Sequence, residues 1–263
     1  MTRSIPPSLA PVLEHLELER PRVVATAELA RIAEEYGIRT PAKLVAHRLV
    51  KRGWLLPTDV RGVWEFAPAE RAGPYSGGDP LLALQATLAN HPETRATVAL
   101  GSALWLLNIS ERAPDQHEVA VPVGDPVPVS VQRNYRVVHY TAHLGPTVVN
   151  GVPVHQPATI LVHLASQPMD VRSWSGVLER LEDLLAACTY EDVSTELLGR
   201  PMATHVRLGY LLSGIAHDWV ERMEIRPAGT VWFGSRGKVR RYDANWHVAD
   251  TILPVSPADL VGA

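Results

Sequence analysis

Residues 26–66 read TAELARIAEEYGIRTPAKLVAHRLVKRGWLLPTDVRGVWEF and decide the fold of the N-terminal part of the chain. Apolar residues at helical spacing predict a helix that Thr26 caps and that ends at Gly37, where glycine allows a positive φ. A second helix is predicted after Thr40, a capping residue, with Pro41 in its first position. Strand-forming residues then flank an Arg-Gly turn. This order predicts a winged helix-turn-helix.

The charge of this segment is one-sided. Residues 38–62 contain six lysine or arginine residues and a single acid, Asp59, although the whole chain carries a formal charge of −3. In the second helix, Leu44, Val45 and Leu49 are expected to point inward, which leaves a cationic stripe on the outer face. A helix of this width fits the major groove of DNA, and cations bind its phosphates. We therefore expect double-stranded DNA to bind through Arg39, Lys43, His47, Arg48, Lys51, Arg52 and Arg61. The alternative is a solvated charged face on a winged fold that contacts protein.

The composition is that of a globular protein, with 263 residues of which 46% are hydrophobic and 20% charged. Cys188 is the single cysteine, which excludes an intrachain disulfide, a four-cysteine zinc site and a Cys-x-x-Cys redox motif. The first twenty residues lack the apolar core of a signal peptide, and apolar runs stay below the roughly 18 residues of a membrane span. We expect a cytoplasmic protein.

A loop composition rich in glycine marks the best domain boundary in the chain. We expect a winged helix-turn-helix domain over residues 1–70, a linker over 71–79 and a larger mixed α/β domain over 80–263. Within that second domain the patterns predict helices first, then strands, then more helices, and strands again near the end. The strands include 118–123, 127–131, 135–140 and 151–154, and the helices include 80–90, 98–107, 158–166, 174–187, 190–198 and 202–213. The fold class is therefore α+β.

The sequence offers little to support a catalytic site. His139 and His143 are four residues apart but lack the acid of a zinc-binding HExxH helix. Ser102 is not followed by the second glycine of a nucleophile elbow, and no glycine-rich phosphate loop opens a helix. Glu179, Glu182 and Asp183 are interpreted as a solvated helix face. We expect no catalytic residue, no metal and no cofactor, and a protein that is not an enzyme.

A second basic cluster lies near the C-terminus, in the loop GSRGKVRR. It could extend a DNA footprint, touch another nucleic acid, hold a partner protein or be a plain solvated hairpin. The sequence leaves these four alternatives open. The candidate second basic surface consists of Arg236, Lys238, Arg240 and Arg241.

Five segments in order along the chain resemble the AbiEi-like antitoxins of type IV toxin–antitoxin systems. LVKRGWLLPTDVRGVWEFAPAE is similar to that family's junction between helix and wing, and GPYSGGDPLLALQATLA to its interdomain linker and the following helix. LGSALWLLNISERAPDQHEVAVP resembles its next helix-turn-strand unit. HVRLGYLLSG and NWHVADTILP resemble two late landmarks. The five segments occupy residues 49–70, 73–89, 100–122, 205–214 and 245–254.

The resemblance implies a protein with two roles and a part in phage defence. Its winged helix would bind inverted repeats in its own promoter and repress its operon, through Lys43, His47, Arg48, Lys51 and Arg61. Its C-terminal domain would counteract a nucleotidyltransferase-like toxin, with or without direct contact, and residues 236–241 are a candidate surface for that role. The segment VHQPATILVHLAS departs from the family pattern, because Gln156 and His163 stand where many members have an acidic helix start.

Two other functional classes remain open from the residues alone. One is a stand-alone winged-helix transcription factor whose C-terminal domain senses a small molecule, in a pocket that Trp105 or Trp174 would close. The other is an interaction module whose winged fold contacts protein.

Overall fold

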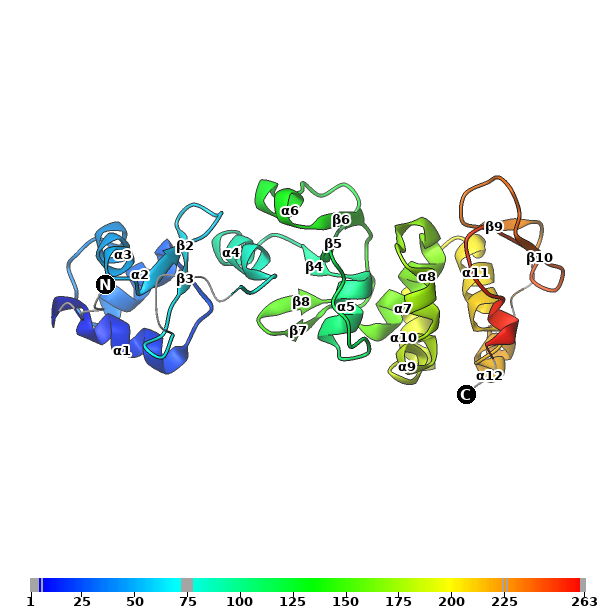
Figure 1. Ribbon diagram of the computed structural model, residues 1–263, viewed down its shortest axis with the longest axis horizontal. Coiled ribbons are helices and arrows are strands. Elements are labelled where there is room, and N and C mark those ends of the chain that lie inside the picture. The colour runs from blue at the N-terminus through cyan, green and yellow to red at the C-terminus, as the bar shows by residue number, and fades with distance from the viewer. Residues whose placement is uncertain (1–4, 6, 72–77, 224, 226, 261–263) are drawn as a thin grey trace. The chain divides into compact units, whose positions relative to one another are not determined.

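The computed structural model describes residues 5, 7–71, 78–223, 225 and 227–260 (Figure 1). The chain divides into two compact units, Met1–Arg95 with Pro126–Tyr135, and Ala96–Asp125 with Arg136–Ala263. Helices and three sheets are mixed in the α+β manner that the sequence predicts. Residues 72–77 of the expected linker lie outside the described residues. Among the helices that the structure describes, none has the length and apolar character needed to cross a membrane.

The first unit contains the predicted helices and strand pair, with one further strand that closes the sheet. Its three strands run antiparallel in the order β1-β3-β2, so that β3 lies in the middle. Fully buried apolar side chains from α1, α2, α3 and β2 meet in one core, among them Leu16, Leu29, Leu49 and Leu55. The elements are a 3₁₀ turn η1 (Pro7–Leu9), α1 (Ala10–Glu19), β1 (Val23–Ala25), α2 (Thr26–Glu35), α3 (Ala42–Lys51), β2 (Leu55–Pro57) and β3 (Val63–Phe66).

The starts of α2 and α3 differ from the sequence prediction. Thr26 does not cap α2: Ala25 holds the cap position, and the N–H and the hydroxyl of Thr26 both donate to the Gly62 carbonyl, at 2.8 and 2.9 Å. Its side chain therefore ties the helix to the wing. Thr40 does not cap α3 either: the helix begins at Ala42, and Pro41 holds the cap position without a side-chain hydrogen bond. The end of α2 is as predicted, since Gly37 has a φ of +65°.

The first unit extends beyond the predicted winged domain. Helix α4 (Leu82–Asn90) packs on β1 and β3, and α6 (Val129–Asn134) packs on α4. The strand predicted over 127–131 is wrong, because Pro128 starts a helix there in which only Val131 is buried. Packing therefore divides the chain at a different place from the expected linker, since α4 covers the small sheet of the winged elements. The functional division at 71–79 stays a prediction.

The second unit is built on a five-stranded mixed sheet in the order β6-β5-β4-β8-β7. The β5–β6 and β4–β8 pairs are parallel, and the β4–β5 and β7–β8 pairs are antiparallel. Helix α5 (Leu100–Leu106) packs on β5 and on the buried helix α7 (Pro157–Ser166). The strands are β4 (Thr97–Val98), β5 (Glu118–Val121), β6 (Arg136–His139), β7 (Thr147–Val149) and β8 (Val152–Val154).

Helix α7 organises the helical half of the second unit, because α9, α10 and α11 all pack on it (Figure 1). The helix predicted over 174–187 is two helices, α8 and α9, separated at residues 179–180. A small sheet in the order β10-β11-β9 follows, with β11 parallel to β9. These elements are η2 (Pro168–Asp170), α8 (Trp174–Leu178), α9 (Leu181–Ala186), α10 (Tyr190–Leu197), α11 (Met202–Leu212), α12 (His217–Arg222), β9 (Val231–Phe233), β10 (Arg241–Asp243), β11 (Val248–Asp250) and η3 (Pro257–Asp259).

Candidate nucleic-acid interface

Helix α3 presents a cationic outer face because its inner face is fixed in the core. Val45, Ala46 and Leu49 are buried. Leu44, which was expected to point inward, is 50% exposed and belongs to the outer surface. Successive residues of an α-helix lie about 100° apart around its axis, so Leu44 lies outside the face on which its neighbour Val45 is buried. An exposed leucine there could contact the methyl group of thymine.

Every side chain predicted to touch DNA is exposed, and all lie in the first unit. Most come from α3 itself, while one precedes the helix, one follows it directly and one lies in the wing turn. The set is Arg39, Lys43, His47, Arg48, Lys51, Arg52 and Arg61. The structure therefore brings together on α3 the residues that the four-residue spacing grouped, and it leaves them accessible to a ligand.

The wing turn that carries Arg61 is an ordered structure. The Thr58 hydroxyl donates to the Val63 carbonyl at 2.8 Å and accepts the N–H of Val60 at 3.2 Å. Gly62 has a φ of +82°, and a Cβ there would lie 3.0 Å from the Thr26 hydroxyl. Since Thr26 begins α2 and α2 packs on α3, the turn is held against the helices that position the cationic face.

Helices α2 and α3 differ in whether their cationic side chains form ion pairs. On α2, Arg31 contacts Glu28 at 2.7 Å and Glu35 at 3.3 Å, and its hydrogen bond lowers the pKa of the Glu28 carboxyl. Within the described residues, Lys43 and Lys51 of α3 form no ion pair. The cations of α3 are therefore available to an external anion, whereas the arginine of α2 is already neutralised by its own helix.

The second basic cluster is smaller than its sequence suggests. Arg241 contacts the fully buried carboxylate of Asp250 at 2.8 Å, and the same carboxylate accepts the N–H groups of Ile252 and Leu253 at 2.9 Å. Arg241 therefore anchors the small C-terminal sheet. The exposed cations of the loop are Arg236, Lys238 and Arg240.

The segment that departs from the family pattern is part of the core. His163 is fully buried in α7, stacks on the Tyr140 ring at 4.0 Å and lies 3.1 Å from the Asp170 carboxylate. Burial lowers the pKa of His163 and lowers that of its neighbour His155 to about 3. Gln156 holds the cap position of α7 and donates to the Gly145 carbonyl at 2.6 Å. These residues support the fold rather than an open site.

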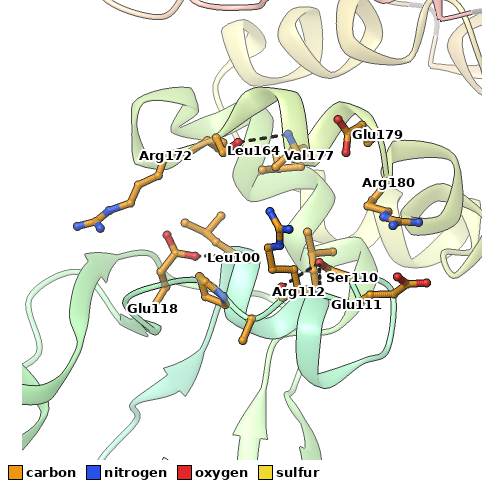
Figure 2. Close-up of a pocket in the computed structure, with 17 residues that line it drawn as sticks. Leu100, Ser110, Glu111, Arg112, Glu118, Leu164, Arg172, Val177, Glu179 and Arg180 are labelled. Carbon is orange, nitrogen blue, oxygen red and sulfur yellow. Dashed lines mark hydrogen bonds between the residues drawn. The ribbon is translucent and has the colours of Figure 1, made fainter. Parts of the chain in front are cut away.

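The second unit also contains a cavity of about 480 Å³ that the sequence did not reveal (Figure 2). Leu100, Leu104, Leu164 and Val177 contribute apolar surface, and charged side chains surround it. Trp105 and Trp174, which were expected to close a pocket, do not line it. No sequence signal could have located it, because its walls come from 100–118, Leu164 and 171–180, which only the fold brings together. The remaining lining residues are Gly101, Ser110, Glu111, Arg112, Ala113, Pro114, Glu118, Val171, Arg172, Ser173, Gly176, Glu179 and Arg180.

Two comparisons with known proteins found a similar protein or family. The sequence matches none of the curated proteins with which it was compared. Among solved structures, the chain is similar to the RV2827C protein from Mycobacterium tuberculosis, with a TM-score of 0.73 and 25% sequence identity over 96% of this chain and 94% of that one. A family model described as the AbiEi antitoxin C-terminal domain matches residues 96–214. The resemblance to the AbiEi-like antitoxin family that the sequence motifs predict is thereby confirmed.

Proposed function

We propose that this protein is the antitoxin of a type IV toxin–antitoxin system, which binds its own promoter and counteracts a nucleotidyltransferase-like toxin. The observation that carries the proposal is the combination, in one chain, of a match to the AbiEi antitoxin C-terminal domain over 96–214 with an exposed cationic helix in the first unit. The family match supports the antitoxin role. The charge and exposure of α3 support the DNA role.

In the proposed DNA complex, α3 lies in the major groove. Lys43, His47 and Lys51 face base edges and the adjacent backbone, while Arg48 and Arg52 bind phosphates on either side. Arg61 reaches a phosphate or the neighbouring minor groove from the wing. Binding to inverted repeats would place one copy of α3 on each half-site and would repress transcription of the operon by occupying its promoter.

The test is co-expression of the full-length chain with a nucleotidyltransferase-like toxin from the same operon, where one is encoded there, scored for growth and for promoter activity. We expect growth to be restored and the promoter to be repressed. Full-length variants are required, because a fragment that begins at residue 80 would remove α4 from the small sheet on which it packs. Failure to restore growth would contradict the antitoxin role, and loss of repression without loss of rescue in α3 variants would separate the two activities.

A stand-alone transcription factor with a sensing domain is the second candidate, and the cavity in the second unit favours it. The two candidates differ in a simple way. An antitoxin restores growth to cells that express the toxin, whereas a solitary sensor does not. A ligand that changes promoter occupancy in the absence of any toxin would favour the sensor.

A further inference from the structure

The cavity of the second unit has the dimensions of a small-molecule site. Its volume of about 480 Å³ falls within the range of roughly 300–1,000 Å³ that ligand pockets occupy. Its walls are α5 and the following loop on one side, and α7 with the segment 171–180 on the other (Figure 2). Leu104 and Leu164 are 3% and 1% exposed, so most of each side chain is packed in the core behind the cavity. An apolar group could bury itself against this wall.

Arg112 is a cation of the cavity lining whose side chain has no partner within the described residues. Its guanidinium rises from the loop into the space below Leu164 and Val177 (Figure 2). Two other arginines of the lining have partners, since Arg172 donates to Gln116 at 2.9 Å and Arg180 lies 3.7 Å from Asp183. In the described part of the chain, the Arg112 side chain has no hydrogen bond or ion pair, and only its backbone is bonded, to Ser110.

The acid nearest the apolar wall is already neutralised. Glu118 is 4% exposed, accepts the N–H of Gly101 at 2.8 Å and pairs with Arg136 at 2.8 Å. Burial raises the pKa of its carboxyl, while the Gly101 N–H and the Arg136 guanidinium act in the opposite direction. Because Arg136 compensates its charge, Glu118 does little to offset the positive potential of Arg112 at the apolar wall. Glu111 and Glu179 are exposed at the rim.

Leu100 is held in a strained conformation at the wall of this cavity. Its φ is +47°, a left-handed value that leucine rarely adopts. Glu118 fixes it from both sides, because its carbonyl accepts the N–H of Ala99 at 3.0 Å and its side chain accepts the N–H of Gly101. Ser102 reinforces the junction by accepting the N–H of Glu118 at 2.8 Å. Strain of this kind persists where the surrounding structure enforces it, and it concentrates at ligand sites.

We propose that this cavity binds a small amphipathic organic anion, with its apolar body against Leu100, Leu104 and Val177 and a single carboxylate or phosphate group on Arg112. The exposed acids at the rim, Glu111 and Glu179, disfavour a highly charged ligand such as a nucleoside triphosphate. A bare inorganic anion would leave the apolar wall uncovered. The proposal does not depend on DNA binding or on toxin neutralisation.

The test uses the full-length protein and two fluorescent probes that share a ring system. Anilinonaphthalene sulfonate carries one anion, and phenylnaphthylamine is its uncharged counterpart. We expect one molecule of the sulfonate to bind per chain, more tightly than the amine. The substitution Arg112→Ala should weaken the sulfonate roughly tenfold, because a charge-assisted hydrogen bond is lost, and should leave the amine unchanged. The matched control Arg133→Ala, an exposed arginine of the first unit, should change neither.

A second variant tests the location independently of charge. Ala113 is exposed on the lining, and Ala113→Trp places a large side chain in the cavity, so both probes should bind more weakly. Octanoate and octyl phosphate, below their micelle-forming concentrations, should displace the sulfonate, and the stronger competitor identifies the head group. Equal binding of the two probes, an unchanged sulfonate affinity in Arg112→Ala or in Ala113→Trp, or displacement by neither competitor would overturn the proposal. A retained thermal transition and retained amine binding exclude unfolding of Arg112→Ala.

Discussion

The charged side chains of α3 are exposed to solvent, whereas the helical half of the second unit contains a charged side chain that is buried. On α3 the charged side chains are exposed, and Lys43 and Lys51 have no ionic partner among the described residues. In α10, the side chain of Glu196 is fully buried, pairs with Arg200 and accepts hydrogen bonds from neutral donors. Removing one partner of a buried ion pair destabilises the fold, whereas a solvated charge without a partner contributes little to stability and is available to a ligand. The comparison predicts that substitutions around α10 lower the stability of the fold, whereas substitutions on α3 weaken DNA binding.

The largest effect is expected from Glu196→Ala. The carboxylate accepts hydrogen bonds from the Tyr140 hydroxyl at 2.9 Å, from two backbone N–H groups and from Thr159, and it pairs with Arg200 at 2.5 Å. Removal leaves the partly buried Arg200 guanidinium without its carboxylate and several donors without their acceptor, so the free energy of unfolding should fall by about 3–5 kcal/mol in urea titrations. Glu191→Ala, an exposed acid on the same helix, should change it by under about 0.5 kcal/mol. Similar losses in the two variants would contradict the comparison.

Charge reversal on α3 should weaken DNA binding and leave the stability of the fold unchanged. The double variant Lys43→Glu, Lys51→Glu should bind promoter DNA roughly a hundredfold more weakly, because two phosphate or groove contacts become repulsive. Its urea midpoint should stay near that of the parent, since both side chains are exposed and unpaired within the described residues. The double variant Arg112→Glu, Arg180→Glu makes the same change in net charge in the second unit. If both double variants weaken binding equally, only the net charge matters and α3 has no special role.

The sequence predicted the first unit well because its signals are local. Helical periodicity, Gly37 and the Arg-Gly turn act within a few residues, and the structure has the helices and the strand pair where they indicate. Local signals failed where a distant partner decides. Thr26 has the chemistry of a helix cap, but it is the first residue of α2 and its hydroxyl donates a hydrogen bond to the Gly62 carbonyl. Residues 127–131 alternate like a strand, but Pro128 and the contact with α4 favour a helix.

Local sequence signals also predicted one candidate site, the cationic surface of α3, and missed the other, the cavity. The cationic stripe of α3 follows from a four-residue repeat, and the exposure of its side chains is as predicted. The orientation of Leu44 was not, because the width of the buried stripe depends on how α2 and the sheet pack. The cavity could not be predicted at all. Its features depend on the contact between Glu118 and Gly101 and on the position of Arg112 below Leu164 (Figure 2), which no periodicity encodes.

The buried histidines make the stability of the second unit depend on pH. The pKa of His155 in the folded protein is about 3, below the value of about 6.5 for an exposed histidine, so the unfolded chain binds the proton more tightly. The contribution of the neutral buried histidine to the free energy of unfolding is fully present above about pH 6.5 and is lost as the pH falls toward 3. The free energy of unfolding changes by up to about 1.4 kcal/mol per pH unit for each such histidine. His155→Phe should reduce this slope in urea titrations between these limits. His139→Gln, an exposed histidine, should leave it unchanged.

The smallest effects distinguish a phosphate contact from a base contact within the α3 surface. Lys51→Ala and Arg61→Ala should each lower the magnitude of the log-log dependence of promoter affinity on salt by about one, because each phosphate contact releases about one counterion. Leu44→Ala removes an exposed apolar contact on the same helix and releases no counterion, so it should weaken binding while leaving the slope unchanged. An unchanged slope in both Lys51→Ala and Arg61→Ala would remove α3 and the wing from the phosphate backbone, and would leave the winged fold as a protein-contacting module.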